Sequence, residues 1–411
     1  MNRFLKNYGA TLALLAGILL GALCGILWPD AARAVGPVGE LFLNLIFVMI
    51  VPLVFFSIAG ATCGLRRGGI LGKVLLSVLA VFAGMSLVAA LTGWLGTCVY
   101  SPFDAADRQR ILGAIAPDLG STGERLSPLK ALVGALTVSD FGLLLSKEHL
   151  LALIVFAALF GYAVCLAGPK GRPMETFIQS GSEVMVRMMK IVMVAAPVGL
   201  GCYFADTVAR VGSQLLGGYL RVLVLYLALT LLFFFGINSL YVLTARGKEG
   251  LKNYWKHIWD PVATAVATSS SAATMPVAIE AAKRMGVRTP VAEAVIPLGT
   301  HIHKDGSVMG AVFKIVFLML LTGRPMSGWG VLLTIVGVAL MEAVVLGAVP
   351  GGGLAGEVFI CSVLGFSPDM VGVIVVIGTI IDIPATLLNV NANVVAALLV
   401  DRMSPPAAEE A

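Results

Sequence analysis

Residues 260–280 read DPVATAVATSSSAATMPVAIE, an apolar stretch with a run of hydroxyl residues, Thr268–Ser271, at its centre. Further on, Val349–Gly356 reads VPGGGLAG, in which three glycines follow a proline. Neither centre favours a continuous helix in lipid, where unpaired backbone groups cost several kcal/mol each. Interrupted segments of this kind are typical of transporters whose half-helices point at a binding site. The alternative is ordinary loops between complete spans, which the short flanking arms disfavour.

The whole chain has the composition of a multi-pass membrane protein. Its 411 residues are 58% hydrophobic and 12% charged, with a mean hydropathy of +0.96. Lys and Arg follow the even-numbered apolar runs, so we expect a cytoplasmic N-terminus in a bacterial inner membrane. The Lys and Arg residues of these connecting loops also explain the net charge of +5, so no nucleic-acid partner is expected. Six runs that could span a bilayer precede residue 250: Tyr8–Trp28, Glu40–Leu65, Val74–Val99, His149–Leu166, Ile191–Phe204, which is short and borrows Met185–Met189, and Leu220–Leu243.

Two polar groups interrupt the apolar second half. Asp382, Thr386, Asn389 and Asn393 are spaced to share one face of a helix, and a carboxylate on such a face is a candidate functional residue. A polar seam between two helices is the alternative. The second group lies in GTHIHKDGSVMG, at 299–310, where His301, His303, Lys304 and Asp305 stand close together.

Four ordered motifs in this half resemble the dicarboxylate/amino acid:cation symporter family, the glutamate transporter homologues with the sodium:dicarboxylate symporter fold. SSSAATMP at Ser269–Pro276 is similar to its first hairpin tip, and PLGTHIHKDG at Pro297–Gly306 to its PLGATINMDG. VPGGG at Val349–Gly353 is similar to its second hairpin, and NVNAN at Asn389–Asn393 to its NVTGD. Weaker similarity upstream extends the resemblance over nearly the whole chain.

The resemblance implies an all-α, elevator-type fold of eight transmembrane helices and two re-entrant helical hairpins, assembled as a homotrimer. Residues 1–250 are then mainly scaffold helices, 251–402 the transport core and 403–411 a disordered tail. Hairpin one is expected at Lys252–Met285, the broken helix at Val287–Leu321, hairpin two at Gly328–Phe366 and the last helix at Pro368–Arg402. The implied substrate-binding residues are Ser269, Ser270, Ser271, Thr274, Ser307, Gly351, Gly352, Asp382, Thr386 and Asn389.

The sequence departs from the family at the sodium sites. The asparagine and methionine of NMDG are replaced by His303 and Lys304, and the aspartate of NVTGD by Asn393. An ammonium group in place of oxygen ligands repels sodium, so we read Lys304 as a replacement for the ion, with snorkelling to an interface as the alternative. Histidine titrates near neutral pH and burial disfavours charged lysine, which makes proton coupling available. The ion-coupling candidates are His301, His303, Lys304, Asp305, Asn389 and Asn393; a metal site is the weaker interpretation, and no cofactor is expected.

Residues at the family's substrate-contacting positions also differ in this sequence. Ala385 stands where acidic-amino-acid members have an arginine for the side-chain carboxylate, whereas Asp382 keeps the position that receives an amino group. We therefore expect a symporter of a small amino acid or carboxylate, with sodium coupling reduced or replaced by protons. The alternatives are a conventional cation-coupled dicarboxylate or glutamate symporter and a transport-deficient binding or sensing protein. An intramembrane enzyme is disfavoured, because nothing fixes a nucleophile beside a base.

Overall fold

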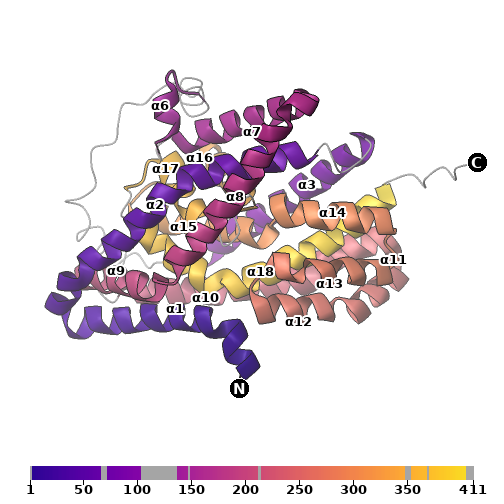
Figure 1. Ribbon diagram of the computed structural model, residues 1–411. Helices are drawn as coiled ribbons and strands as arrows, with labels where there is room; N and C mark the ends of the chain where they lie inside the picture. Colours follow the sequence, from indigo (N-terminus) through magenta and orange to yellow (C-terminus); the bar gives the residue numbers. More distant parts are fainter. Residues whose placement is uncertain are drawn as a thin grey trace, which may run out of the picture.

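The structure is a computed structural model that describes residues 2–65, 72–102, 137–146, 149–211, 214–347, 353–367 and 370–403. All regular elements of these residues are helical (Figure 1). The first half contains α1 (Asn2–Leu27), α2 (Pro29–Leu65), α3 (Gly72–Val99), α6 (Phe141–Leu144), α7 (Leu150–Leu166), the 3-10 turn η3 (Gly168–Gly171), α8 (Arg172–Met193), α9 (Ala196–Val211), α10 (Gln214–Leu231), the π-helical turn η4 (Leu232–Ile237) and α11 (Asn238–His257).

The second half contains α12 (Trp259–Thr268), α13 (Ser271–Arg284), α14 (Thr289–Ile302), α15 (Asp305–Leu321), α16 (Trp329–Gly347), α17 (Gly353–Leu364) and α18 (Met370–Met403). Its helices are mostly short, because the serine-rich and HKDG segments interrupt them. Residues 404–411 of the predicted disordered tail and residues 349–352 of the VPGGG tip, with Gly351 and Gly352, lie outside the described residues.

Several helices are long and apolar enough to cross a membrane. The described residues contain four, or five if the bent pair α8–α9 forms one span. They run over Pro29–Gly60, Ser77–Val99, Leu216–His257 and Met370–Met403. The chain is therefore a membrane protein, while the count of eight spans stays a prediction.

The fifth predicted span is wrong as a single helix. Ile191–Phe204 lies across the junction of α8 and α9, and these two helices meet at an angle of 60°. Pro197 falls in the first turn of α9, a position that suits proline because its missing N–H has no partner there. The apolar run continues through the bend, so hydropathy alone could not locate it.

Helix α1 packs closely against α9 through glycines spaced four residues apart. A Cβ atom at Gly17 would lie 2.1 Å from the carbonyl oxygen of Pro197, and one at Gly21 would lie 2.2 Å from that of Gly201. Gly25 continues the same face. Small residues at this spacing let membrane helices approach until their backbones touch. Helix α2 packs beside this pair and also against α7 and α8.

Helix α18 is the centre of the second half. It packs against α10 to α15, α17 and α3, and α15 packs against α3, α16 and α18. Figure 1 shows α11 to α14 gathered around the C-terminal part of α18. The polar face predicted on α18 therefore lies inside a helical bundle, among elements that carry the other candidate residues.

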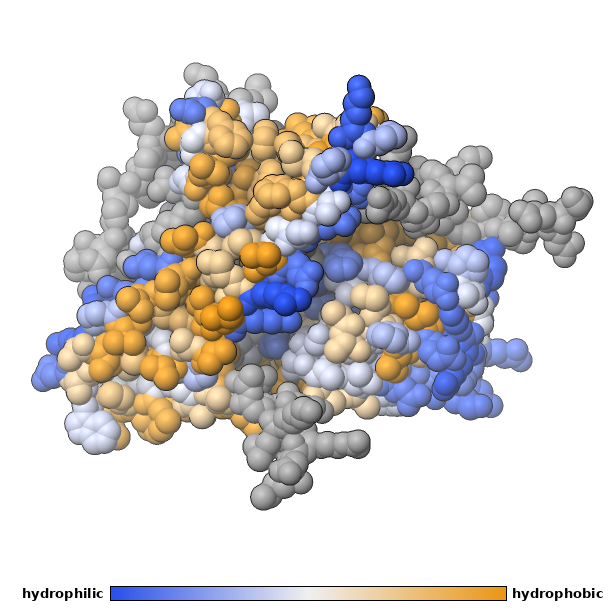
Figure 2. Space-filling model, viewed as in Figure 1, coloured by the Kyte–Doolittle hydropathy of each residue, from blue (hydrophilic) through white to orange (hydrophobic). Residues whose placement is uncertain are grey.

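The surface divides into an apolar and a polar part. In Figure 2, hydrophobic side chains cover much of the face over α1 and α2, whereas hydrophilic ones lie along α8 and at the end that contains α11 to α13. Large apolar side chains of α1, α2 and α8 are exposed, among them Leu20, Val48 and Ile191. Such a continuous apolar face is typical of contact with lipid or with another membrane subunit.

Candidate functional site

The serine-rich segment forms a sharp turn between two packed helices, α12 and α13. Ser269 has a left-handed backbone with φ of 47°, and no other described residue apart from glycine has a positive φ. Ser270 caps α13, because its Oγ accepts a hydrogen bond from Ala273 N at 3.2 Å. A strained serine at a helix boundary is a feature of ligand-binding tips. The predicted break in the helix is confirmed.

The predicted hydroxyl residues do not all face a ligand. Thr274 is completely buried, and its Oγ1 donates to the carbonyl of Ser270 at 2.8 Å. Thr274 and Ser270 therefore hold the turn together. Among the described residues, Ser269 Oγ is buried without a hydrogen-bond partner, and Ser271 is the first residue of α13. A buried hydroxyl of this kind is unusual, because most buried polar atoms form a hydrogen bond.

The HKDG segment separates α14 from α15. His303 and Lys304 have extended backbones, with φ of −130° and −139°. The buried hydroxyl of Tyr226 on α10 donates to the carbonyl of Gly306 at 2.7 Å, which satisfies one backbone group near the break. Gly306 leaves no space for a side chain, since a Cβ there would lie 2.3 Å from the carbonyl oxygen of Ala385. The broken helix is thus packed directly on α18.

His303 lies between Asp305 and Asn393. It is fully buried; its Nδ1 lies 3.0 Å from Asn393 Oδ1 and its Nε2 lies 3.0 Å from Asp305 Oδ1. The second contact is close but poorly aligned for a hydrogen bond. Ser86 Oγ donates to the same Asp305 oxygen at 2.8 Å. Phe82 stacks on the imidazole, with ring centroids 4.3 Å apart and planes within 1°.

This cluster places a protonatable ring where oxygen atoms converge. Both ring nitrogens lie 3.0 Å from an oxygen, and the contact of Nδ1 with Asn393 has the geometry of a hydrogen bond. The stacked phenyl ring covers the remaining side. Asp305 is therefore brought to His303. His301, two residues before His303, is exposed.

The polar face of α18 is confirmed, and its members have different roles. Asn389 fixes the start of α15, because its Oδ1 accepts from Ser307 N at 3.1 Å and its Nδ2 donates to Ser307 Oγ at 3.0 Å. Thr386 is buried beside it, whereas Asp382 is exposed. Asp382 is thus a carboxylate on this face that a ligand can reach.

Lys304 is part of a second charged group. It is half-buried, and the charges of Glu342 and Asp382 both act on it. The carboxylates of α16 and α18 therefore lie close enough to act on the ammonium group of Lys304. An ammonium between two acidic groups neutralises part of their charge in a low-dielectric interior.

Three charged residues next to this group were missed by the sequence analysis. Lys314 Nζ donates to Glu342 Oε1 at 3.0 Å and to Glu357 Oε1 at 2.7 Å. The lysine is 4% exposed, and the two glutamates are 0% and 1% exposed. Each stands alone in an apolar segment, which is the signal that should have marked it, since an ionisable residue in a membrane helix is a functional candidate by default. We call these three residues the ion triad.

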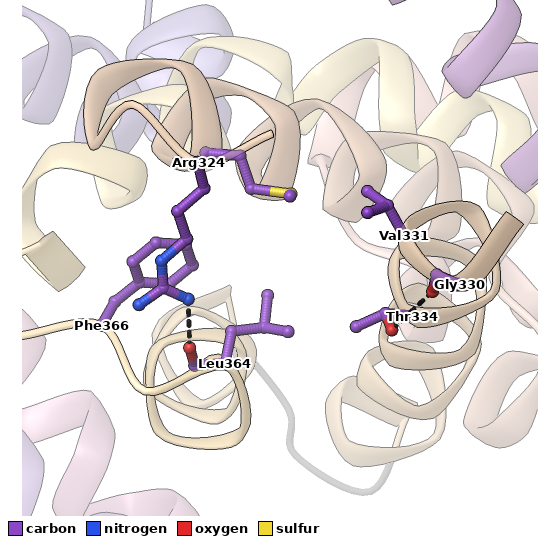
Figure 3. A pocket seen from close by; sticks show the side chains of 7 residues that line it. Arg324, Gly330, Val331, Thr334, Leu364 and Phe366 are labelled. Atoms are coloured by element: carbon purple, nitrogen blue, oxygen red, sulfur yellow. Dashed lines mark hydrogen bonds between the residues drawn. The ribbon is translucent and has the colours of Figure 1, made fainter. Parts of the chain in front are cut away.

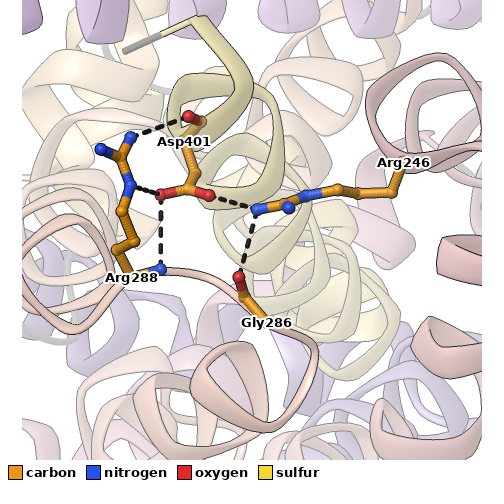
Figure 4. A network of polar contacts seen from close by, with 4 residues as sticks. All are labelled: Arg246, Gly286, Arg288 and Asp401. Carbon is orange, nitrogen blue, oxygen red and sulfur yellow. Dashed lines mark hydrogen bonds and ion pairs between the residues drawn. The ribbon is translucent and has the colours of Figure 1, made fainter. Parts of the chain in front are cut away.

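Asp401, near the C-terminal end of α18, forms ion pairs that join helices of the bundle. Figure 4 shows Asp401 between two arginines from different elements. Arg288 Nε donates to Asp401 Oδ1 at 2.7 Å, and Arg246 forms an ion pair with Oδ2. Arg246 also donates to the carbonyl of Gly286 at 3.2 Å. The network ties α11 and the start of α14 to the end of α18, in contrast with the ligand-accessible Asp382.

A cavity of about 180 Å³ lies away from these residues, between the ends of α15, α16 and α17 (Figure 3). Arg324 contributes its main polar side chain. The guanidinium lies over the ring of Phe366 at 4.1 Å and donates to the carbonyls of Leu364 at 2.5 Å and Gly365 at 2.9 Å. The guanidinium of Arg324 therefore satisfies carbonyl groups at the C-terminus of α17. The other residues that line the cavity are mostly apolar. Among the described residues, no three or more His, Cys, Asp or Glu are placed to hold a metal.

A profile of the sodium:dicarboxylate symporter family matches residues 10–403. The chain belongs to this family. It is similar to the proton/sodium-glutamate symport protein of Bacillus subtilis strain 168, with 25% identity over 404 residues that cover 96% of this chain and 93% of the relative. The proton/glutamate-aspartate symporter of the same organism is 26% identical and covers 95% of this chain and 93% of the relative.

A third relative is named for dicarboxylate transport, whereas the first two are named for amino acids. C4-dicarboxylate transport protein 1 of Pseudomonas paraeruginosa strain PA7 is 27% identical over 398 residues, covering 95% of this chain and 88% of the relative. The resemblance expected from the sequence is confirmed, and so is the expectation of a transporter in place of an enzyme. Membership of this symporter family makes the chain a secondary transporter of a small molecule across a membrane.

Proposed function

We propose that this family member is a symporter of a small amino acid or carboxylate in which His303 takes the place of a sodium ion. Uptake is then independent of sodium and is driven by protons. The observation that carries this proposal is the fully buried imidazole between Asp305 and Asn393, with Phe82 stacked on it. The ring and its stacking partner fill space that a hard cation and its oxygen ligands require.

The substrate is proposed to bind between the serine tip and the polar face of α18. Ser269 offers an open hydroxyl, Asp382 an accessible carboxylate for an ammonium group, and Asn389 fixes the backbone near Ser307. Thr386 lies on the same face. The absence of an arginine at Ala385 favours a neutral amino acid or a monocarboxylate over glutamate. The second tip, with Gly351 and Gly352, is proposed to close the site as a gate.

The larger architecture follows as part of the same proposal. Residues 251–402 move as the transport core against scaffold helices within residues 1–250, by an elevator mechanism in a homotrimer. The interrupted helices, which end at Thr268 and Ile302 and resume at Ser271 and Asp305, support two re-entrant or broken segments. The exposed apolar side chains of α1, α2 and α8 suit lipid or subunit contacts in a bacterial inner membrane.

Uptake into proteoliposomes tests the proposal. Labelled L-serine, L-aspartate and succinate are supplied with sodium or with choline, and with or without an inward proton gradient. We expect accumulation of at least one probe in choline, and a stronger accumulation with the gradient. Strong sodium dependence would contradict the proposal and support a conventional cation-coupled symporter. Saturable binding of a probe without accumulation would support a binding or sensing protein.

Two variants assign the effect to residues. His303→Asn restores the amide of the family motif, so we expect probe binding to become dependent on sodium. Lys304→Met removes the ammonium between Glu342 and Asp382, so we expect binding to fail or to require a cation. Glu280→Gln, at an exposed glutamate of α13, is the control and should behave as the unmodified protein. Sodium-independent uptake by both test variants would remove this cluster from ion coupling.

A further inference from the structure

The ion triad is a buried group with an unbalanced charge. Lys314 comes from α15, Glu342 from α16 and Glu357 from α17, so one ammonium faces two carboxylates. Each carboxylate uses only Oε1 to contact the lysine. The Oε2 atoms of both glutamates are buried and have no hydrogen-bond partner among the described residues. An unpaired carboxylate oxygen in this environment is costly, because it has lost its water without gaining a donor.

The neighbouring charges do not remove the imbalance. Lys304 and Asp382 lie close enough to act on the triad, the first on Glu342 and the second on Glu357. With these two included, two ammonium groups face three carboxylates. Within the described part of the chain, two further titratable groups act on the glutamates: Tyr226, which faces Glu342, and Cys361, which faces Glu357. Both of these are neutral at ordinary pH.

Two glycines shape the space that the carboxylates occupy. A Cβ at Gly356 would lie 2.5 Å from Glu342 Oε1, and a Cβ at Gly378 would lie 2.6 Å from Glu357 Oε1. Any larger residue at either place would displace the lysine-bound oxygen. The helices therefore enclose both carboxyl groups closely, and the triad is a formed site within the packed helices.

We infer that the two glutamates of the ion triad bind one transported proton, held on Oε2 of Glu342 or of Glu357. The proton comes from water on one side of the membrane and converts one carboxylate to a carboxylic acid, which leaves the five-group cluster neutral. No bond between heavy atoms changes. The acid also supplies an O–H donor at an oxygen that otherwise lacks a partner. A neutral cluster crosses a membrane at far lower cost than a charged one.

The position of the triad links this proton to the movement of a helical pair. Glu342 and Glu357 belong to α16 and α17, which pack on each other, and Lys314 belongs to the broken helix. Protonation weakens one of the two attractions that hold this pair to α15. This inference rests on the proposed proton-driven uptake and adds where the proton binds, separately from the His303 cluster.

Infrared difference spectroscopy of the purified protein, without any substrate, tests the site directly. The pH is lowered from about 9 to about 5, the range in which buried glutamates titrate. We expect a carbonyl-stretch band of a protonated carboxylic acid to grow as the pH falls. Protein labelled with ¹³C at the glutamate carboxyl groups should show the band shifted, which assigns it to glutamate without any substitution. Absence of a shifting band in this range overturns the inference.

Substitutions then locate the band. Glu342→Gln and Glu357→Gln each remove one carboxyl of the pair and should abolish it, whereas Glu280→Gln, at an exposed glutamate, should leave it unchanged. Persistence of the full band in both triad variants would place the proton elsewhere and overturn the inference. If a glutamine variant does not fold, Gly378→Ala displaces the Glu357 carboxylate and should shift the midpoint of the labelled band. An unchanged midpoint counts against the site.

Uptake measurements separate this inference from the proposed function. In proteoliposomes with the probe that accumulates best, Glu342→Gln should lower the rate of gradient-driven uptake at least tenfold. Exchange of internal for external probe, which needs no net proton movement, should continue. Gradient-driven uptake without a glutamate band supports the proposed function and overturns the triad as the proton site. A glutamate band without gradient-driven uptake contradicts the proposed coupling while leaving the binding site established.

Discussion

Replacing Lys314 with methionine should destabilise the protein strongly, and more so at high pH. Methionine has a similar length and is apolar, so the change removes the charge with little change of volume. Glu342 and Glu357, which each contact Lys314 Nζ, lose their cationic partner and stay buried. Removing one partner of a buried ion pair costs about 3–5 kcal/mol, because the remaining charge is uncompensated.

The pH dependence follows from the same geometry. Without the lysine, the two carboxylates are stabilised by taking up protons, which becomes easier as the pH falls. The loss of unfolding free energy in Lys314→Met should therefore be largest in alkaline solution and should shrink toward acid pH. The triple variant that also carries Glu342→Gln and Glu357→Gln has no buried charge in the triad, and it should recover most of the loss at every pH.

The assay is unfolding by denaturant in detergent, followed at several pH values. Lys283→Met is the matched control, because Lys283 forms an ion pair with the half-exposed Glu293 at 2.6 Å. Pairs of this exposed kind contribute about 0–1 kcal/mol. A loss in Lys314→Met as small as in the control, or a loss that grows toward acid pH, would refute the reasoning. Equal stability of the single and triple variants would also refute it.

Three further changes test the packing around the site. Asp401→Asn should lower the unfolding free energy by about 1–3 kcal/mol, because it weakens the ion pairs with Arg288 and Arg246, and it should leave the affinity for an accumulated probe unchanged. Gly299→Ala should cost about 1–3 kcal/mol in the same assay, since its Cβ would lie 2.3 Å from Asn393 Oδ1. Tyr226→Phe should cost about 1 kcal/mol through the lost hydrogen bond to the broken helix. Losses below the error of measurement would contradict each assignment.

The substrate-site prediction follows from exposure. Asp382→Asn should weaken binding of an amine-bearing probe such as L-serine at least tenfold and should leave binding of succinate less affected. The reason is that the accessible carboxylate pairs with an ammonium group, which succinate lacks. Calorimetric titration of both probes measures the difference. Equal weakening for the two probes would show that Asp382 acts on the fold of the site instead.

The sequence alone determined the class of protein and some of the places where helices stop. The apolar composition identifies a membrane protein, because a helix that crosses the bilayer needs about 20 consecutive, mainly apolar residues. The serine run predicted the break at Ser269, and the spacing of Asp382, Thr386 and Asn389 predicted their common face on α18. These are local properties, set by backbone preferences and by the helical repeat.

Tertiary structure decided which charges meet. Lys314 is separated from Glu342 by 28 residues and from Glu357 by 43, and only the packing of α15, α16 and α17 brings the three together. In the same way, His303 reaches Asn393 across 90 residues and lies against Phe82 of α3. Lys304 and Asp305 are neighbours in the sequence, but Asp305 contacts His303, whereas the charges of Glu342 and Asp382 act on Lys304. Electrostatic partners depend on distances in space, and a one-dimensional pattern carries those distances only within a single helix.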